Sequence, residues 1–489
     1  MTNNDYSIKK FTVKQLIIAI AATALCGLVM VWASVIKFFV IGEPVTTGVW
    51  LCILTLTISF GVFLGGILLF AIVSRTFIIA HPKYYIAFMT VVTISFLAHL
   101  YLSILSPLMI APGLTAMIIV QISRQKQDAL MLNLMESVMV MWVLLLESIM
   151  TDGEIFMVIG GNGVYLWLLA FITVINIGAG AAIPLVLKNK TRRINYIVLG
   201  CIIMLASEAL YVLMSFIRQD GVDLFSYFWV VFVSGAIPLF AALVINPIME
   251  SAFNLVTDNR LAEWTDSRQP LLRRLATEAP GTYNHCLAVA NFAEICATAI
   301  GEDPYLARAA AYYHDIGKLL NPSYFTENQS GYNPHDDILP EVSVEIIRKH
   351  STDGYKLLKE HRLPEEIASV AIEHHGTSPI KVFYERAKGL TDGEVNIDDY
   401  RYHGRTPRSK ISGIIMICDS SEAAIRAMDK PDGERVEKLL RAIIGERIAQ
   451  GQFDECKLSM LDLEVIRKTI ISAFGGVFHQ RVKYPGGEK

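Results

Sequence analysis

Apolar residues are distributed unevenly along this chain. Long apolar runs fill roughly the first half, whereas charged residues are frequent in the second. We therefore expect a transmembrane domain over residues 1–250 and a polar domain over residues 251–489. A helix needs about 20 mostly apolar residues to cross the hydrocarbon core of a bilayer. Eight segments are candidate spans: residues 15–41, 47–73, 84–105, 108–122, 129–150, 164–187, 196–217 and 225–244.

The fourth of these segments is shorter than the others and is interrupted by Pro107, Pro112 and Gly113. Backbone irregularities at membrane depth are tolerated where they are buried in protein or line a cavity. The segment therefore either spans the membrane or re-enters it from one side. Only residues 42–46 separate the first two segments, so we expect no large extracellular domain between them.

The polar domain shows the apolar spacing of helices nearly throughout, with proline and glycine at the breaks. Together with the apolar segments, this predicts an all-α protein: a polytopic bundle of transmembrane helices followed by an all-helical domain. Helices are expected at residues 271–275, 284–300, 305–319, 341–360, 364–373, 409–429, 434–450 and 461–479.

Charge and composition narrow the class of partner. Hydrophobic residues make up 53% of the chain, which is too many for an ordinary soluble protein. Basic residues recur in alternate loops, which places the polar domain in the cytoplasm and makes membrane lipid a partner. The formal net charge of −3 gives no support for binding a nucleic-acid polymer. A small-molecule partner is favoured, and the sequence leaves open whether the chain forms a homodimer.

The polar domain contains a set of histidines and aspartates that predicts a metal centre. They stand at predicted helix ends or within helices, and they supply enough imidazole and carboxylate groups for two metal ions. Such donors suit Mn, Fe, Zn or Co, and two metals sharing a carboxylate are typical of centres that hydrolyse phosphate esters. The set consists of His285, His314, Asp315, His350, His374, His375 and Asp419. Lys318 lies three residues after Asp315 and hence on the same side of a helix.

His314 and Asp315, followed by Lys318, resemble the motif of HD-domain metal-dependent phosphohydrolases. Longer stretches narrow the resemblance to the PgpH-type cyclic di-AMP phosphodiesterases, also called seven-transmembrane HD receptors. These stretches are residues 270–275, 279–285, 311–318, 327–329, 333–336, 374–377 and 451–456. Family members usually carry a large extracellular domain after the first span, for which this chain leaves no room.

The resemblance implies a division of the ligands between two metals, with Mn or Fe as the working metal. His285, His314, Asp315 and Asp419 would bind one ion, and Asp315, His350, His374 and His375 the other, so that Asp315 is the bridge. Lys318 would act with Asp315 in catalysis. Arg401, Tyr402 and Lys410 are expected to contact the nucleotide. The implied reaction is hydrolysis of cyclic di-AMP to linear pApA at a bacterial inner membrane.

Two other hypotheses stay open at this point. The polar domain could bind a nucleotide as a receptor without cleaving it, or it could hydrolyse another cyclic dinucleotide such as cyclic di-GMP. All seven expected ligands are present, which favours turnover over binding alone. A transporter is disfavoured, because a transporter does not need this metal set.

Overall fold

The computed structural model describes residues 12–40, 54–55, 57–62, 64–68, 81–105, 111–122, 126–152, 174–183, 193–218, 224–429 and 431–477. Over these residues the regular structure is helical, apart from one isolated bridge between Pro379 and Arg401. The prediction of an all-α protein is thus confirmed. The chain divides into two compact units, residues 1–257 and 258–489.

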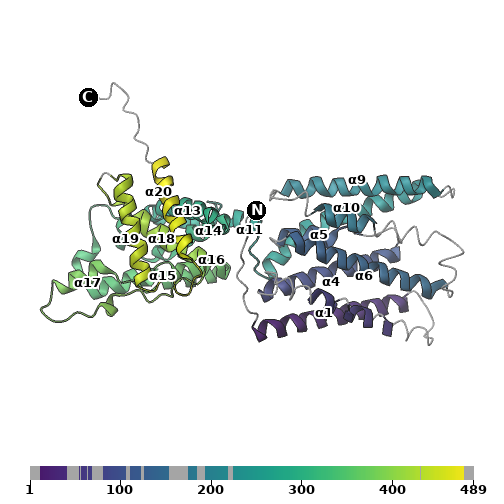
Figure 1. Ribbon diagram of the computed structural model, residues 1–489, viewed down its shortest axis with the longest axis horizontal. Helices are drawn as coiled ribbons and strands as arrows, with labels where there is room; N and C mark the ends of the chain where they lie inside the picture. The colour runs from purple at the N-terminus through teal and green to yellow at the C-terminus, as the bar shows by residue number, and fades with distance from the viewer. Residues whose placement is uncertain are drawn as a thin grey trace, which may run out of the picture. The chain divides into compact units, whose positions relative to one another are not determined.

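The first unit contains long apolar helices (Figure 1). Among the described residues, three stretches are long and apolar enough to cross a membrane: Val13–Lys37, Pro82–Leu102 and Phe228–Ala252. Many of their large apolar side chains are exposed, as Trp32 and Phe240 are, which suits a lipid environment. The described helices are α1 (Val13–Val40), α4 (Pro82–Leu105), α5 (Leu114–Ile122), α6 (Lys126–Asp152), α9 (Arg193–Arg218) and α10 (Leu224–Ala252). The expected loop at residues 42–46 and most of the segments at 47–73 and 164–187 lie outside the described residues.

The interrupted fourth segment forms a short buried helix over its described part. Helix α5 has nine residues, so it is about 13 Å long at 1.5 Å per residue, well short of a hydrocarbon core of about 30 Å. Polar contacts hold its start, where the Gly113 amide donates to Asn176 Oδ1 at 2.7 Å and Thr115 donates to Glu136. Glu136 also lies 3.3 Å from His99 Nδ1, so the buried carboxylate faces an imidazole.

Helix α4 also holds the segment that follows α10. The Tyr84 hydroxyl accepts from the Val256 amide at 3.0 Å, and Lys83 Nζ donates to the Asn254 carbonyl at 3.2 Å. Asn254 has a positive φ of 46°, where the chain turns away from the α10 helix. We call these two hydrogen bonds the α4 clasp. They fix the last residues of the first unit to the start of α4.

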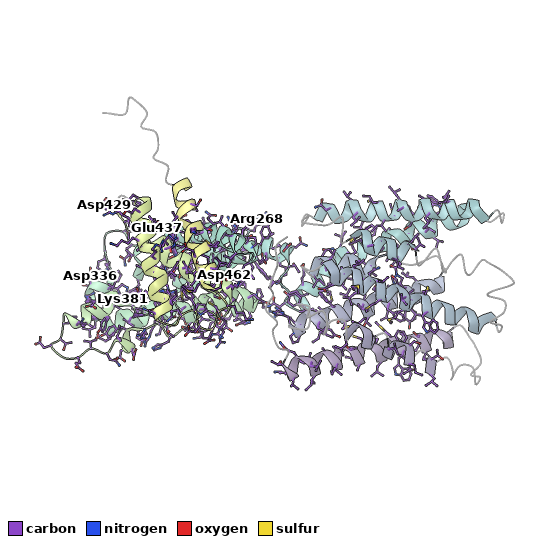
Figure 2. The ribbon with its side chains drawn as sticks, in the orientation of Figure 1. Arg268, Asp336, Lys381, Asp429, Glu437 and Asp462 are labelled. Carbon is purple, nitrogen blue, oxygen red and sulfur yellow. The ribbon has the colours of Figure 1, made fainter. Side chains whose placement is uncertain are left out.

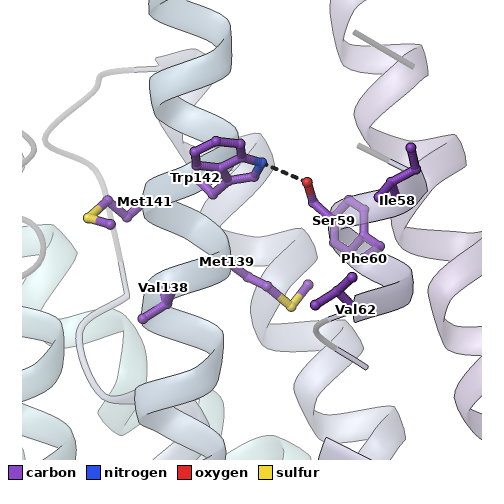
Figure 3. Close-up of a pocket in the computed structure, with 8 residues that line it drawn as sticks. All are labelled: Ile58, Ser59, Phe60, Val62, Val138, Met139, Met141 and Trp142. Atoms are coloured by element: carbon purple, nitrogen blue, oxygen red, sulfur yellow. Dashed lines mark hydrogen bonds between the residues drawn. The ribbon is translucent and has the colours of Figure 1, made fainter. Parts of the chain in front are cut away.

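An apolar pocket lies between residues 58–62 and helix α6 (Figure 3). The Trp142 indole donates to Ser59 Oγ at 3.0 Å across it. The other lining residues are Ile58, Phe60, Val62, Val138, Met139 and Met141. Because this described lining carries no ionisable group, the pocket is unsuited to phosphate chemistry.

The second unit is built around helix α13, which packs against α12, α14, α18 and α20. Alanines of α13 and α14, such as Ala293 and Ala310, are fully buried and allow the helices to approach closely. The α-helices are α11 (Asp258–Trp264), α12 (Pro270–Glu278), α13 (Pro280–Ala299), α14 (Pro304–Tyr313), α15 (Pro340–Glu360), α16 (Glu365–Glu373), α17 (Lys381–Lys388), α18 (Lys410–Arg426), α19 (Gly433–Ala449) and α20 (Met460–Val477). The 3₁₀ turns are η1 (Ile316–Leu320), η2 (Pro322–Tyr324), η3 (Thr326–Asn328), η4 (Pro334–Asp337) and η5 (Ile397–Tyr400).

The eight helices expected in this unit are present, and α11 and α17 were not predicted. The expected helix at residues 305–319 divides into α14 and η1, because the chain leaves the α-helical path at His314. This break turns the side chains that follow His314 toward the centre of the unit.

Gly317 permits the close contact between η1 and α15. A β-carbon at this position would lie 1.9 Å from the His350 carbonyl oxygen and 2.6 Å from the Gly354 amide nitrogen. We expect Gly317→Ala to destabilise the protein by about 1–3 kcal/mol or more, because backbone atoms must move. Thermal unfolding in detergent measures this. The control is Gly445→Ala within α19, where a β-carbon meets nothing within 4 Å; equal melting temperatures for the two variants would contradict the packing argument.

Candidate metal centre

The structure brings the seven expected ligands together from five helices and the turns that follow them. Their ligand atoms form two groups, within each of which all atoms lie within 4.8 Å of one another. One group is His285, His314, Asp315 and Asp419, and the other is Asp315, His350, His374 and His375. All are buried except the half-buried His375. The division coincides with the one that the family resemblance implies.

Asp315 belongs to both groups, with one oxygen turned toward each. Its Oδ1 lies 3.3 Å from His350 Nε2 and 3.5 Å from His374 Nε2. Its Oδ2 lies 3.4 Å from His314 Nε2 and 3.6 Å from His285 Nε2. A carboxylate placed in this way can serve two cations at once.

Three of the imidazoles are oriented by the backbone carbonyl of the preceding helical turn. His314 Nδ1 lies 2.7 Å from the Ala311 oxygen, and His350 Nδ1 lies 2.5 Å from the Ile347 oxygen. His374 follows the same pattern with an oxygen one helical turn earlier. Because a carbonyl only accepts, Nδ1 carries the proton and Nε2 keeps its lone pair for the centre. This is the usual arrangement of metal-binding histidines.

Two buried polar atoms of the cluster lack a hydrogen-bond partner: His314 Nε2 and Asp315 Oδ1. Both are acceptors in the tautomer just described, and leaving buried acceptors unsatisfied costs about 1–3 kcal/mol each. A divalent cation between the groups would satisfy both. With nitrogen and oxygen donors throughout, the residues fit a divalent metal of the first transition series.

His285 is oriented by a carboxylate that the sequence did not reveal as part of the site. Its Nδ1 lies 2.5 Å from Glu422 Oε2, while its Nε2 lies 2.9 Å from Asp419 Oδ1. Glu422 follows Asp419 by three residues on α18, so both project from one face of the helix, and this spacing is the signal that could have identified it. Glu422 is also paired with Arg426.

The charge states of the cluster suit cation binding. Burial opposes ionisation of Asp315, but Lys318 and His314 hold the pKa of its carboxyl well below the usual value. Burial lowers the pKa of both His374 and His375, which keeps them neutral. Burial also acts on His285, yet hydrogen bonds to Asp419 and Glu422 raise its pKa to about 10. Despite burial, the Asp315 carboxylate also raises the pKa of His314 well above its usual value, so a cation entering this group would displace the Nε2 protons of both His285 and His314.

Lys318 lies against the cluster. Its Nζ is 2.7 Å from Asp315 Oδ2 and 2.8 Å from Glu327 Oε1. Glu327, on η3, also accepts from Thr282 Oγ1 at 2.9 Å, and it was not predicted to take part. Lys318 is thus a half-buried cation held between two carboxylates.

Of the three residues expected to contact the nucleotide, only Tyr402 touches the cluster. Its ring stacks on His375 with the centroids 4.2 Å apart. Arg401 lies beside that loop, where it donates to the Thr377 carbonyl and pairs with Asp398.

Lys410 is placed elsewhere by the structure. It begins α18 nine residues before Asp419, about 13 Å along the helix axis. Its Nζ pairs with Glu302 at 3.6 Å and Asp462 at 3.2 Å. Asp462 is labelled in Figure 2. The structure therefore gives Lys410 a role in linking α18 to its neighbours and does not bring it to the cluster.

Comparison with known proteins defines the class of this unit. Residues 282–424 match the family model of the HD domain, and they include all seven cluster residues. The second unit therefore contains an HD domain.

Two curated proteins are similar to more than half of this chain. Cyclic-di-AMP phosphodiesterase PgpH of Bacillus subtilis is 39% identical over 297 residues, covering 60% of this chain and 40% of that protein. The protein of the same name from Listeria monocytogenes is 38% identical over 318 residues, covering 64% of this chain and 44% of that protein. The chain thus spans less than half the length of either relative.

A solved structure also matches the second part of the chain. The crystal structure of the L. monocytogenes PgpH HD domain in complex with cyclic di-AMP is 44% identical. The match covers 44% of this chain and 100% of that one, with a TM-score of 0.42.

Proposed function

We propose that this chain is a membrane-anchored phosphodiesterase that hydrolyses cyclic di-AMP to linear pApA. The observation that carries the proposal is the placement of Asp315 between two sets of inward-facing imidazoles, one carboxylate oxygen toward each. The names of the two curated relatives support the substrate. The proposal places the chain in a bacterial inner membrane through several spans, with residues 251–489 in the cytoplasm.

The donors divide between two divalent ions, with Mn or Fe as our proposal for the metal. His285, His314, Asp315 and Asp419 would hold one, and Asp315, His350, His374 and His375 the other. Bound divalent ions polarise phosphoryl oxygens and lower the pKa of water at such centres.

The chain's own residues position and neutralise the substrate. The Lys318 ammonium lies half-buried beside Asp315, where it can offset negative charge that develops on a phosphate or on the leaving oxygen. Its pKa is raised, since the two carboxylates outweigh the effect of burial. It therefore stays protonated through the neutral range. The Tyr402 ring covers His375 and limits the rotation of that imidazole.

Glu422 is a positioning residue for His285, and its removal should weaken metal binding. We expect Glu422→Gln to lower the affinity for one Mn²⁺ by about 10- to 100-fold, as is usual for outer partners of metal-binding histidines. Calorimetric titration of the metal-free protein with Mn²⁺ measures this. Glu437→Gln on the surface of α19 is the control (Figure 2). Unchanged affinity in the Glu422 variant would show that the carboxylate does not support the site.

The proposed activity is tested by incubating the detergent-solubilised full chain with Mn²⁺ and either cyclic di-AMP or cyclic di-GMP, with products separated by chromatography. Conversion of cyclic di-AMP to pApA, with cyclic di-GMP spared, is the expected result. Cleavage of cyclic di-GMP alone would reassign the substrate. Tight binding of cyclic di-AMP without cleavage in the Mn²⁺-loaded protein would identify a receptor.

A further inference from the structure

Arg447 of helix α19 reaches two of the segments that carry cluster residues. Its Nη1 donates to Ser378 Oγ at 2.7 Å, and its Nη2 donates to Ser420 Oγ at 3.3 Å. Ser420 directly follows Asp419, and the amide of Ser378 donates to the carbonyl of His375 at 3.1 Å. The guanidinium is therefore held at the border of the metal centre, although it lies 28 residues after Asp419.

The guanidinium of Arg447 lacks a carboxylate partner. Over the described residues no carboxylate oxygen lies within 4 Å of it, and its remaining acceptor is the amide oxygen of Gln450 at 3.4 Å. Its Nε is buried without a hydrogen bond. Arg441 and Arg467, in the same part of the unit, both pair with Glu437. A guanidinium held by neutral groups has no carboxylate to offset its charge, and its longer contacts, at 3.3 and 3.4 Å, can be exchanged for an anion's oxygen.

Tyr402 connects Arg447 to the metal centre. Its ring stacks on His375, and its amide donates to the Ser378 carbonyl at 3.1 Å. Ser378 is thus hydrogen-bonded to both Tyr402 and Arg447, through its carbonyl and its hydroxyl respectively.

The turn after α19 fixes where Arg447 stands. Gln452 Oε1 accepts from the Thr377 amide at 3.0 Å, and its Nε2 donates to Thr377 Oγ1 at 2.9 Å. The Gln452 amide in turn donates to the Arg447 carbonyl at 3.0 Å. Gly451, with a φ of 66°, permits this turn. The end of α19 is therefore attached to the loop that follows His375, and Arg447 is held ready before any ligand arrives.

We infer that Arg447, steadied by Ser378 and Ser420, is a binding site for a phosphate oxygen of the substrate. The inference rests on the proposed function, since it takes the ligand to be a phosphodiester. An arginine fork that is already oriented loses little side-chain entropy on binding a phosphate. Its contribution is to hold the substrate, while the chemistry depends on the cluster.

The test compares Arg447→Met, Arg447→Lys and the control Arg441→Met in the Mn²⁺-loaded full chain, with cyclic di-AMP and with bis(p-nitrophenyl) phosphate. Loss of a charge-assisted hydrogen bond in Arg447→Met should raise KM about 10- to 100-fold, with a smaller change in kcat and unchanged Mn²⁺ affinity. Arg447→Lys should recover part of the loss, because it restores the charge without the fork. Arg441→Met should match the wild type.

Three outcomes would overturn the inference. The first is an unchanged KM in Arg447→Met. The second is a fall in Mn²⁺ affinity, together with an equal rise in KM, in both Arg447 variants. The third is a fall in kcat alone. The use of two substrates distinguishes failure of the Arg447 inference from failure of the proposed function. A wild type that cleaves only the aryl ester would refute cyclic di-AMP as the substrate, and Arg447 would still be judged from the KM for that ester.

Discussion

Asp315→Ala should abolish measurable hydrolysis of cyclic di-AMP while leaving the fold largely intact. The carboxylate turns one oxygen toward His314 of the first group and the other toward His350 of the second, so its loss removes a ligand from each proposed metal at once. Metal ions contribute several kcal/mol to transition-state stabilisation, and losing about 4 kcal/mol lowers the rate about 1000-fold. Initial rates at saturating Mn²⁺ measure this, together with the number of metal ions bound per chain.

The control for this experiment is Asp429→Ala, an exposed aspartate beyond α18 (Figure 2). It should keep full activity and both metals. Circular dichroism should show the same helical content in the Asp315 variant as in the wild type. A variant that retains full activity without Asp315 would refute the two-metal assignment.

Lys318→Met should reduce both activity and stability. The substitution removes the cation that Asp315 and Glu327 share, and breaking a buried ion pair typically costs about 3–5 kcal/mol. The metal-free protein should lose most, because bound Mn²⁺ would compensate Asp315. Melting temperatures with and without Mn²⁺ measure the difference, and initial rates measure the catalytic loss.

A double variant separates the two roles of Lys318. Adding Glu327→Gln to Lys318→Met removes one of the stranded negative charges, so it should restore part of the lost stability. Activity should stay low, because the charge beside the phosphate is still missing. Recovery of activity in the double variant would show that Lys318 acts only by keeping the unit folded.

Local sequence patterns predicted eight helices of the second unit and the residues of the cluster, because both follow from short-range features. Apolar spacing within one helix marks its buried face, and the adjacent pair His314 and Asp315 with Lys318 forms a recognisable motif. Asp419 could be included because an apolar run places it on a buried helix.

Features that depend on packing between distant segments were not predictable in this way. Glu422 orients His285 across 137 positions, and Arg447 reaches Ser378 across 69. The three-residue spacing from Asp419 is a local sign for Glu422, whereas no neighbouring residue indicates Ser378 as the partner of Arg447. Lys410 shows the opposite error. It was expected to contact the nucleotide, but its ammonium group forms ion pairs with Glu302 and Asp462.

The α4 clasp joins the start of α4 to the residues that precede the second unit. A flexible linker in this place would not transmit small movements of a helix. Here Tyr84 and Lys83 are hydrogen-bonded to the backbone of Val256 and Asn254, shortly before the second unit begins. A shift of α4 along or about its axis would therefore also displace the backbone at Val256 and Asn254, close to the residue at which the second unit begins.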